Sequence, residues 1–120
     1  MRTHTSDDYC LNLFRLIVGA RACWKCEHCG HVGEDCNPHH IFSRENKSIR
    51  YDTINGAWLC NACHRFAENY KGLFIKSIQT KRGLDWWNEL VRRKNIIVKW
   101  NDSFRFEWKE KLLSEVKEAA

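Results

Sequence analysis

The sequence has no apolar run long enough to cross a bilayer, and no basic segment ahead of its most apolar stretch. A membrane-spanning helix needs about 20 consecutive apolar residues, so the first absence excludes that class of protein. Residues 11–22 imitate a secretory leader, because they are apolar and end in Ala-Arg-Ala. However, Asp7 and Asp8 stand where a leader is basic, and Arg15 interrupts the apolar run. We therefore expect a cytoplasmic protein with no membrane partner.

Internal repeats, low-complexity tracts and a strong charge imbalance are missing too. Their absence argues against solenoid and disordered classes. With 120 residues, 43% of them hydrophobic, the sequence predicts one domain over residues 1–120 whose modest core benefits from a metal as an added crosslink. The net charge of +5 favours an anionic partner, but a solvated basic surface explains it equally well.

The first half of the chain contains two different patterns. Ser6 is a suitable N-cap, and apolar residues then recur at helical spacing, which predicts a helix over residues 6–20. Residues 24–58 lack this periodicity and contain three glycines and the only proline, Pro38. Such a stretch is typical of loops and a hairpin.

Helical spacing returns after Cys60, first in a helix that carries His64 and then over residues 72–118. Asn101 and Asp102 are predicted to cap the last helix. Aromatic residues alternate with polar ones at positions 104, 106 and 108, which would also suit a strand. However, apolar residues recur every four positions as far as Val116, which favours a helix. The sequence as a whole therefore predicts an α+β fold.

Cysteine occurs seven times, and an odd number does not suit a disulfide framework. Four of the cysteines form two Cys-x-x-Cys pairs: Cys26, Cys29, Cys60 and Cys63. This spacing is typical of a four-thiolate zinc site, which is structural because it leaves no open coordination position. Cys23 and Cys36 remain alternative ligands. Cys10 lies among apolar residues and is predicted to be a small buried side chain.

Between and beside these pairs are polar residues that a zinc quartet does not need: His39, His40, Asn55 and His64. Adjacent residues of an extended segment point to opposite faces, so His39 and His40 cannot easily share one task. His64 directly follows a zinc ligand. With His39, and with Glu68 one helical turn later, it would form a second, open metal site with nitrogen and oxygen ligands. Glu68 could equally be a solvated helix residue.

In this order and spacing, the residues resemble those of the HNH endonucleases. The matching elements are Cys26-x-x-Cys29, His39-His40-Ile41, Asn55 and Cys60-x-x-Cys63-His64. The resemblance implies a ββα-metal unit with structural zinc over about residues 23–71, flanked by the N-terminal helix and the C-terminal helices. Residues 39–55 look particularly like short HNH proteins of bacteriophages and prophages, which would place the protein in the host cytoplasm.

By this resemblance, the chain is a metal-dependent endonuclease that hydrolyses DNA phosphodiester bonds to 5′-phosphate and 3′-hydroxyl ends. His40 takes the position of the general base, and Asn55 that of the residue bracing the hairpin loop that orients it. His39 and His64 match the ligands of one catalytic divalent cation, such as Mg²⁺, Mn²⁺, Ni²⁺ or Zn²⁺. Glu68 falls where some members place another ligand. Many members have aspartate in place of His39, which leaves the metal preference open.

Four basic residues are predicted to contact the DNA backbone: Arg44, Lys47, Arg50 and Arg65. Arginine suits phosphate oxygens, and such contacts position the strand without reading its sequence. A single unit would nick one strand, so double-strand cleavage would need a homodimer, two encounters or a branched substrate. The main alternative is a zinc-ribbon module that binds nucleic acid without cutting it. A structural adaptor that docks through its aromatic C-terminal helices is a third hypothesis.

Overall fold

The computed structural model describes residues 5–119 and begins with helix α1, Asp7–Arg21. The Ser6 hydroxyl caps this helix by accepting a hydrogen bond from the backbone N–H of Tyr9 at 3.1 Å. Two aspartates in the first turn lie at the positive end of the helix dipole. The helix predicted over residues 6–20 is confirmed, and one of its faces is buried along most of its length.

Two short strands follow, β1 (Asn37–His40) and β2 (Gly56–Leu59), and they pair antiparallel with His40 opposite Gly56. Two single turns of 3-10 helix, η1 (Lys47–Ile49) and η2 (Thr53–Asn55), shape the connection between the strands. Gly56 allows α1 to lie directly on the sheet, because an added Cβ would come within 2.5 Å of the Val18 side chain. The end of β1 is thus pressed against α1.

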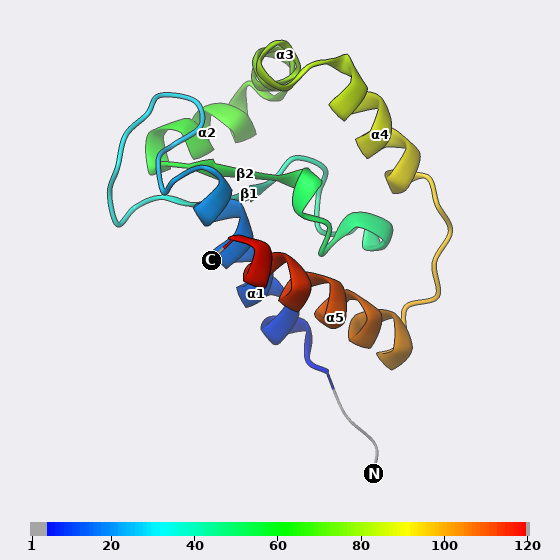
Figure 1. Cartoon of the computed structure of the whole chain (residues 1–120). Coiled ribbons are helices and arrows are strands. Elements are labelled where there is room, and N and C mark those ends of the chain that lie inside the picture. The colour runs from blue at the N-terminus through cyan, green and yellow to red at the C-terminus, as the bar shows by residue number, and fades with distance from the viewer. Residues whose placement is uncertain (1–4, 120) are drawn as a thin grey trace.

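Three helices come next: α2 (Asn61–Asn69), α3 (Lys71–Arg82) and α4 (Leu84–Lys94). The break between α2 and α3 falls at Tyr70, whose φ of −128° and ψ of 56° are not helical. Gly83 joins α3 to α4 with a φ of 94°, a conformation that suits glycine. Figure 1 shows these helices arching over one side of the two strands.

The last helix, α5 (Asp102–Ala119), returns to the start of the chain and lies alongside α1 (Figure 1). The Asn101 side chain accepts a hydrogen bond from the Phe104 backbone N–H at 2.9 Å, so the predicted cap is present. Helix α1 belongs to both hydrophobic clusters of the core. Phe14 and Val18 join the cluster around the strands, whereas Cys10 and Leu13 join the cluster beneath α5.

The predicted α+β class is confirmed, and residues 72–118 are almost entirely helical. The aromatic residues at the start of α5 lie on a helix and not on a strand, as their longer periodicity predicted. Within residues 5–119, no helix combines the length and the apolar character that crossing a membrane would require.

Candidate functional site

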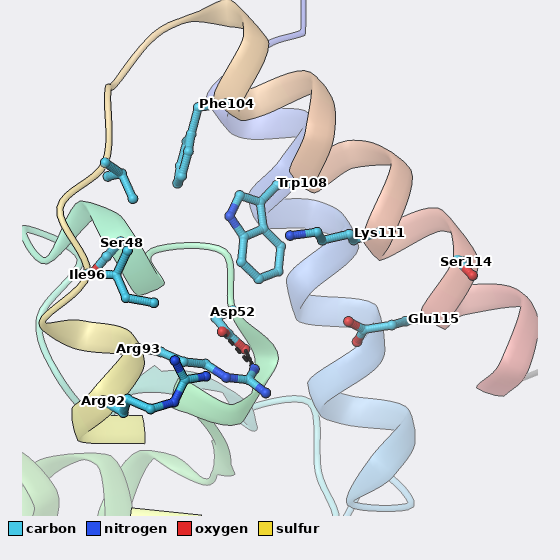
Figure 2. Close-up of a pocket in the computed structure, with 11 residues that line it drawn as sticks. Ser48, Asp52, Arg92, Arg93, Ile96, Phe104, Trp108, Lys111, Ser114 and Glu115 are labelled. Atoms are coloured by element: carbon cyan, nitrogen blue, oxygen red, sulfur yellow. Dashed lines mark hydrogen bonds and ion pairs between the residues drawn. The ribbon is translucent and has the colours of Figure 1, made fainter. Parts of the chain in front are cut away.

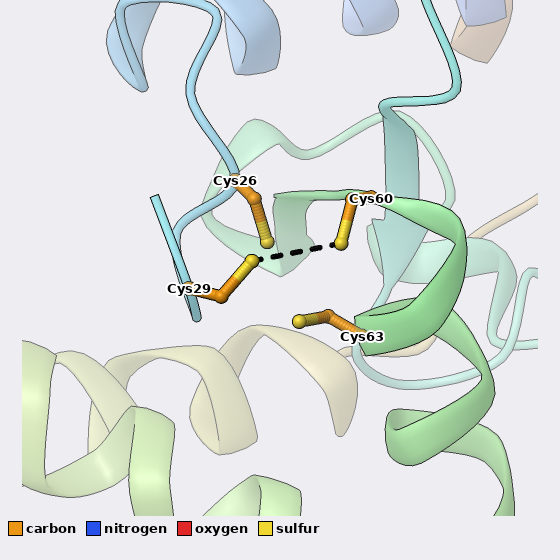
Figure 3. Close-up of side chains that lie close together, drawn as sticks. All are labelled: Cys26, Cys29, Cys60 and Cys63. Carbon is orange, nitrogen blue, oxygen red and sulfur yellow. Dashed lines mark hydrogen bonds between the residues drawn. The ribbon is translucent and has the colours of Figure 1, made fainter. Parts of the chain in front are cut away.

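Four thiols converge where the loop after α1 meets the start of α2. Cys26 and Cys29 lie on that loop, Cys60 is the N-cap residue of α2, and Cys63 lies in its first turn. Their Sγ atoms all lie within 4.8 Å of one another, and the Sγ atoms of Cys29 and Cys60 are 3.6 Å apart (Figure 3). Among residues 5–119, this is the one group of three or more Cys, His, Asp or Glu side chains gathered so closely.

This arrangement fits a zinc ion. Zn–S bonds of about 2.3 Å in a tetrahedron place the sulfur atoms about 3.8 Å apart, close to the separation between Cys29 and Cys60. Cys23 is exposed and outside the group. Cys36 is buried, and its thiol donates to the His31 carbonyl at 3.6 Å. The four predicted ligands are therefore brought together, and neither alternative cysteine joins them.

The thiols differ in how readily they ionise. Burial opposes ionisation of Cys26, but hydrogen bonds from backbone N–H groups outweigh it and lower its pKa to about 7. Burial raises the pKa of Cys63 well above its usual value. The cysteines bind a cation as thiolates, so metal binding requires the thiols to lose their protons. The affinity of the quartet for metal therefore falls as the pH falls.

His39 and His64 face each other from two different elements. His39 lies in β1 and His64 in the first half of α2, and their ring centroids are 5.0 Å apart with the planes at 87°. Two imidazoles that bind one ion through nitrogens at about 2.1 Å have centroids about 5 Å apart, which is the spacing of these two rings. Burial, together with the electrostatic effect of the neighbouring His64 and His40, lowers the pKa of His39 to about 4. The His39 ring is thus neutral at pH 7, as a metal ligand must be.

Glu68 does not complete a three-ligand cluster. Its exposed side chain lines the same pocket, but the ligand atoms of Glu68, His39 and His64 do not all lie within 4.8 Å of one another.

His40 contacts a different element from this pair, although all three histidines line one pocket. Its ring stacks on Phe14 of α1, with 4.5 Å between centroids and 8° between planes. Its Nε2 atom lies 3.0 Å from the backbone oxygen of Arg50. A carbonyl oxygen can only accept, so Nε2 carries the proton and Nδ1 keeps its lone pair. Burial lowers the pKa of His40 to about 4, against the opposing effect of the Arg50 carbonyl.

The Asn55 side chain forms hydrogen bonds with the backbone of Phe42, two residues after His40. This side chain is fully buried, accepts from the Phe42 backbone N–H at 2.8 Å and donates to the Phe42 carbonyl at 2.9 Å. The Asn55 carbonyl also accepts from the Ile41 N–H at 2.9 Å. These three bonds fix the backbone that leaves β1.

A pocket of about 400 Å³ opens beside the histidines. The residues that line it are Leu11, Phe14, Arg15, Pro38, His39, His40, Arg44, His64 and Glu68. Three predicted histidines thus share one cavity with Arg44, a predicted DNA contact. Arg15 enters from α1, where its guanidinium donates to Asn37 Oδ1 at 2.6 Å and lies over the Trp58 ring.

The other three predicted DNA contacts lie outside this pocket. Arg65 is exposed on α2, whereas Lys47 and Arg50 line a separate pocket with Trp100. The Arg50 guanidinium is held by Asp7 through two hydrogen bonds of 2.6 and 2.8 Å. The 3-10 turn η1 directs these side chains away from the histidines, so only the Arg50 carbonyl reaches His40.

The basic run near the end of α4 faces yet another cavity, of about 610 Å³, between α4 and α5 (Figure 2). There Arg93 forms a two-point ion pair with buried Asp52, at 3.0 and 3.1 Å, and also binds Glu89. Arg92 pairs with the same glutamate. These arginines are therefore engaged by carboxylates. Trp108 and Phe104 of α5 form the apolar wall.

No protein-family model, curated protein or solved structure matches this chain. The case for a function therefore rests on the geometry of the thiol quartet and the histidine pocket.

Two residues of this pocket were not anticipated from the sequence. Phe14 belongs to the apolar stripe of α1, so it is indistinguishable from an ordinary core residue until its contact with His40 is seen. Arg15 could have been noticed in the sequence, because a charged residue within an apolar helix face is rarely buried without a polar partner. Here Arg15 pairs with Asn37, and this contact links α1 to the wall of the pocket.

Proposed function

We propose that this protein is a metal-dependent endonuclease of the HNH type that hydrolyses DNA phosphodiester bonds. The observation that carries the proposal is the placement of His39 and His64 face to face in the pocket that also contains His40. A chain that only bound nucleic acid would need neither a facing pair of imidazoles nor a third histidine held in one tautomer in the same pocket.

His40 is the general base in this proposal. Its proton lies on Nε2 against the Arg50 carbonyl, so Nδ1 is the atom that takes a proton from the attacking water. The lowered pKa keeps the ring unprotonated throughout the neutral range. An anionic phosphate in the pocket raises the proton affinity of a nearby imidazole, which brings the base closer to its working range. General-base help of this kind is worth about 10² to 10⁴ in rate.

His39 and His64 hold the catalytic cation in this proposal. A bound divalent cation supplies positive charge to the phosphate and to the leaving 3′ oxygen. Arg44 and Arg15 line the same pocket and offer guanidinium groups to the remaining phosphate oxygens. Glu68 is exposed at the rim, where it can accept hydrogen bonds from water.

The cysteine quartet has a supporting role in this mechanism. Cys63 immediately precedes His64, and Cys60 immediately follows β2, whose partner strand carries His39. Zinc bound by the quartet would therefore fix the first turn of α2 relative to the strands. The separation between the two imidazoles depends on this link.

The test is nicking of supercoiled plasmid by the full chain with Mg²⁺, Mn²⁺, Ni²⁺ or EDTA. We expect metal-dependent nicking that falls at least 100-fold in His40→Ala, with bound zinc unchanged in both proteins. His31→Ala is the matched control, because His31 is exposed and pairs with Asp35 outside the pocket. Full activity is expected for this control.

Two outcomes would count against the proposal. DNA binding without nicking under any metal would favour the zinc-ribbon binding module. Loss of zinc from His40→Ala would mean that His40 supports the structural site and not the chemistry. The ratio of nicked to linear product, measured against protein concentration, tests whether a homodimer is required.

A further inference from the structure

A second basic pocket shares Arg50 with the histidine site. It has a volume of about 420 Å³ and is built from three segments that are far apart in the sequence. Thr5 and Asp7 come from the start of α1, Lys47 and Arg50 from the strand connection, and Trp100 and Arg105 from the start of α5. We call it the Trp100 pocket.

Three cations converge on the Trp100 ring. Lys47 Nζ lies 5.4 Å from the ring centroid, Arg50 Cζ 5.8 Å and Arg105 Cζ 5.4 Å. Tyr51 also stacks on this ring, at 5.6 Å, and fixes its orientation. The attraction between each cation and the ring offsets part of the repulsion among the three positive charges. The repulsion that is not offset favours the binding of an anion in the pocket.

The carboxylates nearby neutralise two of these three charges. Asp7 holds the Arg50 guanidinium, and Asp102 accepts a hydrogen bond from Arg105. Within residues 5–119, Lys47 has no carboxylate partner, and its side chain is exposed. Among the described residues, the Trp100 pocket therefore carries one positive charge without a carboxylate partner, on Lys47.

Thr5 also lines this pocket. The residue is 2% exposed, and its buried hydroxyl has no hydrogen-bond partner in the part of the chain that the structure describes. Thr5 precedes α1, whose N-terminal end attracts negative charge.

We propose that the Trp100 pocket binds one backbone phosphate of the DNA, distinct from the phosphate that is cut. This inference rests on the proposed function. Arg50 connects the two sites, because its carbonyl holds His40 while its guanidinium lines the Trp100 pocket. A phosphate seated there fixes the strand relative to His40 without reading its sequence. The substrate must accordingly extend beyond the scissile position.

The test measures the affinity of a labelled DNA duplex for the full chain at several salt concentrations, without divalent cations. Each phosphate contact contributes about 0.9 to the slope of log affinity against log salt. We expect Lys47→Gln to lower this slope by about 0.9 and to weaken binding about five- to tenfold near 0.1 M salt. Lys99→Gln is the matched control, since Lys99 is exposed next to Trp100 but does not line the pocket. Equal slopes for the two variants would overturn the inference.

Inorganic phosphate separates a site for the DNA backbone from a site for a free anion. Tight binding of inorganic phosphate that Lys47→Gln abolishes, with no change in DNA affinity, would assign the pocket to a free anion and overturn the backbone assignment.

The outcomes also distinguish this inference from the proposed function. A wild type that binds DNA but nicks nothing, with the Lys47→Gln effect intact, would overturn the nuclease proposal and leave the phosphate pocket. A wild type that nicks DNA, with identical slopes for Lys47→Gln and Lys99→Gln, would support the nuclease proposal and overturn the phosphate pocket.

Discussion

The imidazole of His40 and the ring of Phe14 are stacked nearly parallel, 4.5 Å apart. One comes from the end of β1 and the other from the middle of α1, so the N-terminal helix is part of the histidine site and not an appendage to it. The Arg50 carbonyl engages Nε2 of the same ring, so in the proposed mechanism Nδ1 is the nitrogen that acts as the base.

Phe14→Leu should remove the stacked ring while keeping an apolar side chain in the core. We expect a loss of stability of about 1 to 1.5 kcal/mol. Plasmid nicking should fall by about tenfold or more, because His40 would gain rotational freedom. Ile17→Val is the control, since it weakens the core of the same helix by about 0.5 to 1.5 kcal/mol without touching His40. Equal nicking by both variants would show that the stack has no catalytic role.

Asn55→Ala should destabilise the protein by about 2 to 4 kcal/mol, because it leaves the buried N–H and carbonyl of Phe42 without their partners. Urea unfolding monitored by tryptophan fluorescence measures this loss. Asn46→Ala provides a comparison, since that side chain donates one exposed hydrogen bond to Ser43. A loss below 1 kcal/mol in Asn55→Ala would contradict the bracing role.

The ion pair between Asp7 and Arg50 should make stability depend on pH in acid. The Arg50 guanidinium, assisted by the Tyr51 hydroxyl, holds the pKa of Asp7 below its usual value despite partial burial. A carboxylate with a lowered folded-state pKa stabilises the protein above its unfolded pKa, near 3.9, and loses that contribution as the pH falls through the folded value. The difference in unfolding free energy between wild type and Asp7→Asn should thus be constant above about pH 5 and shrink below about pH 4.

The size of this difference is limited by solvent. The Asp7 side chain is 36% exposed, so we expect about 1 kcal/mol or less. Asp8→Asn removes the same charge from the same helical turn without contacting Arg50, and it should show a smaller difference. A difference for Asp7→Asn that grows toward low pH would contradict the assignment.

Cys60→Ser should abolish stoichiometric zinc and lower the melting temperature sharply, since metal binding in small domains is coupled to folding. Cys23→Ser removes an exposed thiol outside the quartet and should keep both zinc and stability. Zinc quantification and thermal unfolding on the same preparations measure these effects. Retention of zinc by Cys60→Ser would show that the ligand set is wrong.

Spacing in the sequence predicted the parts of the site that depend on local geometry. Two Cys-x-x-Cys pairs bring the four thiols together, and strand alternation gives the adjacent His39 and His40 different ring partners. Helix starts were also predictable, because Ser6 and Asn101 accept backbone hydrogen bonds that only an N-terminal turn offers.

Contacts between distant segments were not predictable in the same way. Arg50 was predicted to face DNA beside the histidines, but its guanidinium pairs with Asp7, 43 residues away, and only the folded chain brings the two together. The Phe14 stack and the cations around Trp100 have the same origin. Helix packing decides these contacts, and periodicity identifies only the face that will be buried.

Helix α5, which lies along α1, imposes an order on the biosynthesis of the protein. Cys10 in α1 donates a hydrogen bond to the carbonyl of Arg105, 95 residues later, so the part of α1 that carries Cys10 and Leu13 acquires its neighbours only after α5 has been synthesised. Contacts this distant form late and slow the folding of a small domain. Phe14 belongs to the other cluster and packs against segments that are made earlier, so the two clusters around α1 are completed at different stages of synthesis.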